Sequence, residues 1–276
     1  MTKRAICLGL LLLLALAANA QAAGITDPVN LAEAGQFQLG LEATYQSRIK
    51  FNDTVSDASR RYSDGTGMTY QYAVTDVTLK EDQYYFLTLN YGLLKQLDLF
   101  AKAGLVRGGK KTSGSLPGQY YDLREALAWA VGGKWRLLEA ANGLLLTLAG
   151  QYLRFDGRKQ APAWNINQER DYKMDHWRAD LELVGAWRLG QFTPYVGGVY
   201  TYSELKVYGD TTSVRGGLIQ VTYSDYVTRN STNWGGVAGL AWDFCPAWRL
   251  NLQGEYLDGL TASLSLSYSF QLPWAR

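Results

Sequence analysis

The only histidine of the chain, His176, directly follows Asp175, and a carboxylate beside an imidazole can perform general acid–base chemistry. Adjacent side chains of a β-strand point to opposite faces, so we expect these two groups to lie apart if the segment is a strand. The sequence has no Gly-x-Ser-x-Gly nucleophile elbow and no Cys/His cluster with the spacing of metal ligands. We therefore expect no catalytic residue, no metal site and no cofactor.

A larger set of polar residues lies on the inward face of alternating segments. The set is Glu42, Arg48, Lys102, Arg124, His176, Arg178, Asp180, Glu182, Arg249 and Glu255. Charges of both signs in a narrow interior must pair, because an unpaired buried charge is costly. We expect an internal salt-bridge network in which Glu182 and Glu255 each have a basic partner; the alternative is a narrow polar path for ions.

The elements that would position these residues are strands. From Leu260 to Phe270 the even positions are apolar and the odd positions carry hydroxyl groups, so the two faces of one strand differ completely. Ten segments alternate well enough to be strands: about 36–48, 83–93, 97–107, 123–136, 143–155, 175–188, 191–205, 233–244, 248–256 and 260–270. The pattern predicts an all-β fold, an up-and-down antiparallel transmembrane β-barrel of about ten strands (8–12).

The connections and the aromatic residues agree with a membrane barrel. Short turns alternate with long polar stretches at about 49–82, 108–122, 156–174 and 206–232, as periplasmic turns alternate with external loops in outer-membrane barrels. Outward aromatic residues are expected at two levels, as the two bilayer interfaces select. The long loops are rich in tyrosine, which is common in binding surfaces. Tyrosine is also common where barrel strands extend past the bilayer, and the alternative for 67–80 is such an extension.

The first residues predict an export signal. Lys3 and Arg4 precede a Leu-rich run over 5–18, and small residues then offer cleavage sites. We expect residues 1–22 to be removed and 23–276 to form a single domain. Without Lys3 and Arg4 the basic and acidic residues are equal in number, so we expect no nucleic-acid partner, since such binding needs a basic surface.

This organisation resembles the small bacterial outer-membrane β-barrel proteins over essentially the whole mature chain. Leu264, Leu266, Tyr268 and Phe270 are similar to the carboxy-terminal assembly signal of that class, although the residues after Phe270 form an extra tail. The resemblance implies a location in the cell outer membrane. It also implies contact with outer-membrane lipid and lipopolysaccharide, and with the barrel-assembly machinery through the last strand. We expect a monomer.

Three functions stay open at this point. Eight strands leave an interior that side chains fill, and open channels appear at about sixteen, so the leading interpretation is a structural or narrow, weakly permeable channel role with exposed Tyr-rich loops. An alternative is a surface adhesin or receptor that uses the loops. A second alternative is a hydrolase like the omptins, ten-stranded outer-membrane proteases with an Asp-x-His motif at the external rim; here Asp175 and His176 are adjacent instead.

Overall fold

The computed structural model describes residues 25, 27–113, 120–160, 168–215 and 217–271. The predicted signal peptide, 1–22, lies outside the described residues. The strands are β1 (Gln36–Lys50), β2 (Thr54–Tyr62), β3 (Gly67–Val74), β4 (Thr78–Leu94), β5 (Leu97–Thr112), β6 (Tyr121–Asp122), β7 (Ala126–Glu139), β8 (Leu144–Lys159), β9 (Gln168–Trp187), β10 (Phe192–Arg215), β11 (Leu218–Arg229), β12 (Trp234–Cys245), β13 (Trp248–Tyr256) and β14 (Leu260–Gln271).

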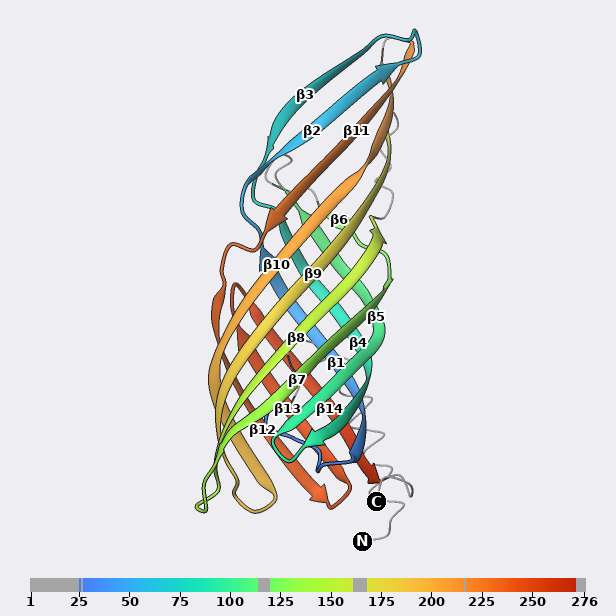
Figure 1. The fold of residues 1–276 in the computed structure, drawn as a ribbon. Coiled ribbons are helices and arrows are strands. Elements are labelled where there is room, and N and C mark those ends of the chain that lie inside the picture. Colours follow the sequence, from blue (N-terminus) through green and yellow to red (C-terminus); the bar gives the residue numbers. More distant parts are fainter. Residues whose placement is uncertain (1–24, 26, 114–119, 161–167, 216, 272–276) are drawn as a thin grey trace.

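Ten of these strands form a closed antiparallel ring, in the order β1-β4-β5-β7-β8-β9-β10-β12-β13-β14 (Figure 1). The last strand closes the ring on the first: Gln36 lies opposite Gln271, and the pairing continues without a break to Gln46 opposite Thr261. The start of β1 and the end of β14 lie at the end of the barrel that carries the short turns (Figure 1). The predicted all-β barrel of about ten strands is confirmed.

The outward faces of the ring strands carry an apolar belt. Its exposed members include Leu41, Leu87, Leu99, Leu127, Val131, Leu183, Val196, Leu240 and Leu252. A surface of this composition meets lipid in outer-membrane barrels. No helix among the described residues is long and apolar enough to cross a membrane.

Aromatic side chains border this belt at two levels. At the external level, Trp177 stacks between Tyr152 and Tyr202, with ring centroids 5.8 and 5.2 Å away. At the periplasmic level the ring pairs are Phe37–Tyr91, Phe192–Trp242 and Trp248–Tyr268. Two such girdles mark the bilayer interfaces, so the strands span the membrane between them and continue outside beyond the external girdle.

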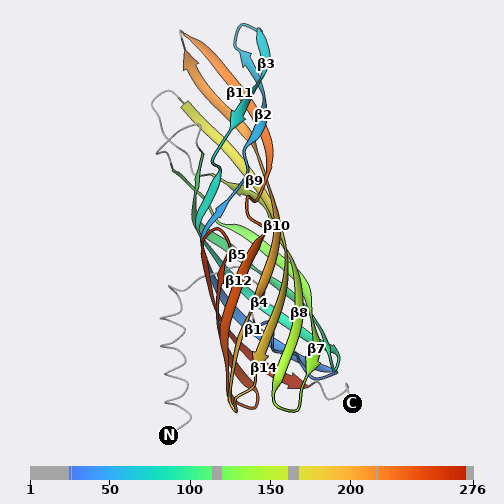
Figure 2. The ribbon, with the colours of Figure 1, turned by 90° about the vertical axis from the view of Figure 1, so that its left-hand side faces the viewer.

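Outside the ring, the chain builds an external sheet where the sequence pattern predicted long loops. β10 continues past its pairing with β12 and pairs with β11 from Glu204 to Arg215. β2 then pairs with β11, and β3 pairs with β2 at the end of the sheet. Figure 2 shows these strands rising well above the ring. The prediction of loops over 49–82 and 206–232 was wrong. These segments form strands that are buried mainly at the end nearest the ring, and polar residues occur on both of their faces.

Candidate functional site: the barrel lumen

The centre of the lumen is filled by a buried ionic cluster around Arg178 on β9. Its Nε donates to Asp180 Oδ1 at 2.5 Å, and its Nη2 donates to Glu255 Oε1 on β13 at 2.7 Å. Thr201 on β10 donates to the same Asp180 oxygen at 2.7 Å. The side chains of the three ionic residues are at most 1% exposed, so the cluster links three strands inside the ring without open water between them.

A second ion pair lies nearer the periplasmic end. Lys102 on β5 contacts Glu42 on β1 at 2.8 Å, and both side chains are almost fully buried. The Lys102 ammonium also lies over the ring of Phe100, 5.6 Å from its centroid. Parity placed both charges on the inward face, and the structure shows that they meet there across β4.

The periplasmic end is closed by the segment that precedes β1, which we call the N-terminal plug (residues 25 and 27–35). Ile25, Val29 and Ala32 are at most 2% exposed. Asp27 accepts from Arg249 Nε at 2.8 Å, and the backbone N–H of Ala32 donates to Asp98 at 2.6 Å. The sequence pattern gave no sign of this segment, because it has neither strand alternation nor a helical period.

Glu182 has a different environment from the one predicted. Its Oε1 accepts from the backbone N–H of Ile25 at 3.1 Å and from Gln253 Nε2 at 3.5 Å, and no basic partner contacts it among the described residues. The expectation of a basic partner was wrong for Glu182 and right for Glu255. The plug, which the parity argument did not include, supplies the donor.

Two residues of the predicted set lie outside the lumen. Arg48 is exposed at the external rim, where its Nε donates to the backbone oxygen of Asp258 at 3.0 Å. Arg124 precedes β7 and is also exposed. On β1 the buried positions change from even numbers up to Gln46 to odd numbers from Ile49, so Arg48 turns outward. Arg124 follows the buried Leu123 and takes the opposite, exposed side. Placing these two residues in the lumen network is therefore corrected.

Arg158 is a lumen residue that the sequence pattern missed. It is fully buried, pairs with Asp82 Oδ1 at 2.7 Å and donates from Nε to the backbone oxygen of Arg124 at 2.9 Å. The pairing of β8 with β9 shifts between Phe155 and Arg158, and Gly157 has a φ of 63°. This bulge reverses the parity of the strand, so Arg158 turns inward where simple alternation would turn it out.

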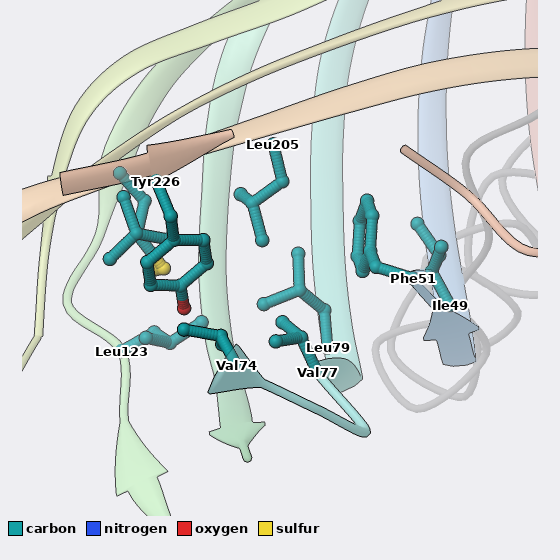
Figure 3. Packing of buried hydrophobic residues seen from close by; sticks show 10 residues of the cluster. Ile49, Phe51, Val74, Val77, Leu79, Leu123, Leu205 and Tyr226 are labelled. Carbon is teal, nitrogen blue, oxygen red and sulfur yellow. The ribbon is translucent and has the colours of Figure 1, made fainter. Parts of the chain in front are cut away.

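Above Arg158 an apolar cap closes the external end. The cap is a buried cluster from six strands and their connections: Ile49, Phe51, Val74, Val77, Leu79, Leu123, Met174, Leu205, Val207 and Tyr226. Figure 3 shows these side chains converging from opposite walls. The side chains of this cluster pack together, so the lumen is filled above the ionic cluster as well as below it.

His176 belongs to this apolar region. It is 1% exposed, and its ring lies 5.1 Å from that of Phe155 and 6.1 Å from that of Phe51. Asp175 points to the other face of β9 and accepts from the backbone N–H of Gly157 at 2.7 Å. The two side chains therefore do not contact each other. No group of His, Cys, Asp and Glu side chains suited to a metal occurs among the described residues.

The sequence matches no family model, and it matches no curated protein. Among solved structures, the outer membrane protease OmpT from Escherichia coli has a TM-score of 0.49 and 15% identity over 88% of this chain and 100% of its own. The outer membrane protein OprG from Pseudomonas aeruginosa has a TM-score of 0.45 and 15% identity over 88% of this chain and 99% of its own. With its closed ten-stranded ring, apolar belt and paired aromatic girdles, the chain has the fold of an outer-membrane β-barrel.

Proposed function

We propose that this protein is a closed outer-membrane barrel that serves as a scaffold for its external sheet and does not act as an open pore. The observation that carries the proposal is the filling of the lumen at three levels: the N-terminal plug, the Arg178 cluster and the apolar cap. A ten-stranded barrel is narrow to begin with. Outer-membrane lipid and lipopolysaccharide around the belt, and the barrel-assembly machinery at β14, are its proposed partners.

Single-channel recording in planar bilayers tests this proposal. The purified full-length protein is expected to show small or no conductance steps, while its heat-modifiable gel mobility shows that it is folded. A general porin reconstituted in the same bilayers serves as the positive control for detection. Large and stable steps from this protein would overturn the closed barrel, because they require a continuous water path past Arg178.

A receptor or adhesin role for the external sheet is the second candidate. Its motivation is a group of exposed apolar side chains beyond the external girdle: Ile219 and Tyr223 on β11, and Val214 on β10, are each at least 47% exposed. Exposed apolar patches outside a membrane mark interaction surfaces. Cells that display the Ile219→Asp variant should adhere to host cells less than wild type, whereas Gln220→Asp, on the opposite face of β11, should not differ from wild type. Equal adhesion of all three would exclude this role for the patch.

A further inference from the structure

A cavity of about 180 Å³ lies above the apolar cap, between strands of the external extension. Side chains from β3, β5, β6, β9, β10 and β11 line it. Those that carry its chemistry are Tyr72, Lys111, Tyr121, Arg170, Tyr172 and Tyr226. Pockets for drug-sized ligands begin at about 300 Å³, so a cavity of this size suits a smaller molecule.

The charged side chains among the described lining residues are all basic. Lys111 and Arg170 both line the cavity, and none of the other described lining residues is acidic. Lys111 is only 6% exposed, and its Nζ lies 5.3 Å from the ring centroid of Tyr226 and 5.9 Å from that of Tyr172. In the lumen below, by contrast, Lys102, Arg158 and Arg178 each contact a carboxylate, and the buried Lys134 donates to the backbone oxygen of Asn30. Among the described residues no carboxylate contacts Lys111, so the cavity offers a buried positive charge to an anion.

The tyrosines supply flat walls and one unused donor. The Tyr172 hydroxyl is within hydrogen-bond distance of Thr211 at 3.2 Å and Ser224 at 3.0 Å. The Tyr226 hydroxyl is buried and has no partner among the described residues, although the side chain lines the cavity. Buried polar groups are almost always hydrogen-bonded, and a ligand oxygen in the cavity would give this hydroxyl an acceptor. Arg170 lines the same cavity, and its Nη1 donates to the Tyr121 hydroxyl at 2.6 Å.

We propose that this cavity binds a small organic anion, a carboxylate carried on a flat aromatic body. The carboxylate lies against Lys111 and Arg170 and accepts from the Tyr226 hydroxyl, and the flat body stacks between the tyrosine rings, which favour offset or edge contacts. The site lies above the cap, so it does not depend on whether the lumen conducts.

Burial, and then the nearby Arg170 charge, lower the pKa of Lys111 to about 8. The other titratable groups that face Lys111 are tyrosines: Tyr72, Tyr121, Tyr172 and Tyr226. The amine is therefore protonated at neutral pH and becomes neutral as the pH rises through about 8. Anion affinity should fall over the same range, by about tenfold between pH 7 and pH 9.

Calorimetric titration of the purified full-length protein in detergent at pH 7, with benzoate as the probe, tests the proposal. Benzoate should bind once per chain, and acetate and inorganic phosphate should each bind at least tenfold more weakly, because neither offers an aromatic face. Lys111→Met should weaken benzoate binding at least tenfold. The control is Lys110→Met: Lys110 is the next residue but is half exposed and paired with Glu81 at 2.8 Å, so benzoate affinity should stay within twofold.

Tyr226→Phe removes only the hydroxyl and should lower benzoate affinity about fivefold, the value of one hydrogen bond. If Lys111→Met lacks the gel mobility of the folded form, the Tyr226→Phe variant and the pH series test the anion site in its place. The proposal is overturned if wild type does not bind benzoate, or if phosphate binds as tightly. It is equally overturned if Lys110→Met and Lys111→Met lose the same affinity, or if affinity is unchanged from pH 7 to pH 9.

Discussion

Arg178 is the residue on which the central lumen depends, because its guanidinium joins carboxylates from β9 and β13. Glu255→Ala removes one of those carboxylates and leaves a buried cation with Asp180 alone. Breaking a buried pair costs about 3–5 kcal/mol, and we expect a loss of about 3 kcal/mol in the free energy of unfolding because Asp180 remains. Urea unfolding in detergent, followed by tryptophan fluorescence, measures the loss.

The matched control is Glu204→Ala at the external rim. Glu204 lies 3.4 Å from Arg229, whose side chain is 63% exposed, and exposed pairs contribute less than about 1 kcal/mol. If the Glu204 and Glu255 variants unfolded at the same urea concentration, the lumen would have to be wet, and the closed barrel would give way to a water-filled path.

Gly239 on β12 makes room for the largest neutral side chain of the lower lumen. A methyl group at this position would lie 2.2 Å from Cζ of Tyr195, whose hydroxyl donates to Gln253 at 2.8 Å. Gly239→Ala should therefore destabilise the barrel by about 1–3 kcal/mol through overpacking. Gly254→Ala is the control, since its nearest neighbour would be 3.9 Å away. Equal unfolding midpoints for the two variants would contradict the close packing.

Strand parity alone was enough to place most of the lumen residues, because a two-residue period decides which face a side chain takes. Parity could not choose partners across the ring, since that requires the stagger between strands. It therefore gave Glu182 a basic partner that it lacks, and it missed Arg158, whose orientation depends on a bulge. A bulge adds one residue to a strand and so reverses the alternation of its faces. The residue types around the bulge remain typical of a strand, so the sequence does not reveal it.

At the scale of elements, the N-terminal plug covers the lower lumen. Asn30 exchanges hydrogen bonds with Gln38, and Gln38 is 2% exposed as a result. In a Cys245→Ser background, Gln38→Cys should react slowly with a maleimide-polyethylene glycol reagent, and deletion of residues 25–34 should speed the reaction at least tenfold. Asp64→Cys, at the tip of the β2–β3 hairpin, is the control and should react at the same rate in both. An equally fast reaction at position 38 before the deletion would show that the plug does not cover it.

The β2–β3 hairpin is an addition to the ring and not part of it. Its strands pair only with β11 and with each other. Replacing residues 54–73 with a short Gly-Ser linker should therefore leave the heat-modifiable folded form intact, although Val74 and Val77 of the cap lose neighbours. Removing β13 and β14 should abolish that form, because the ring cannot close. Loss of the folded form in both variants would mean that the hairpin is needed for ring assembly.

The ring strands were predictable at this scale because one face of each meets lipid and the other does not. The external strands were not, since both faces of β2 and β3 carry polar groups and tyrosines, a pattern shared with loops. The plug was invisible for a related reason. The ring strands around the plug bury it, and its own sequence has no periodic pattern from which that burial could be predicted.

At the scale of the whole molecule, the lumen is filled at three levels by groups that do not share residues. The plug, the Arg178 cluster and the cap come from different levels of the barrel. Deleting residues 25–34 should thus leave the single-channel conductance as small as that of the full-length protein. Planar-bilayer recording of both proteins, with folding checked by gel mobility, measures this. Porin-like steps in the deletion variant alone would show that the plug is the only barrier.

The pairing of β1 with β14 has a consequence for the order of events in assembly. Phe37 lies opposite Phe270, so the contact that closes the ring joins the first ring strand to the last. Contacts between residues so distant in sequence form slowly, because the chain loses conformational entropy before the contact contributes any stabilisation. Every other ring strand can pair with its neighbour as an open, curling sheet. Before β14 pairs with β1, that sheet has two unpaired edges. A chain truncated before residue 260 would retain both unpaired edges.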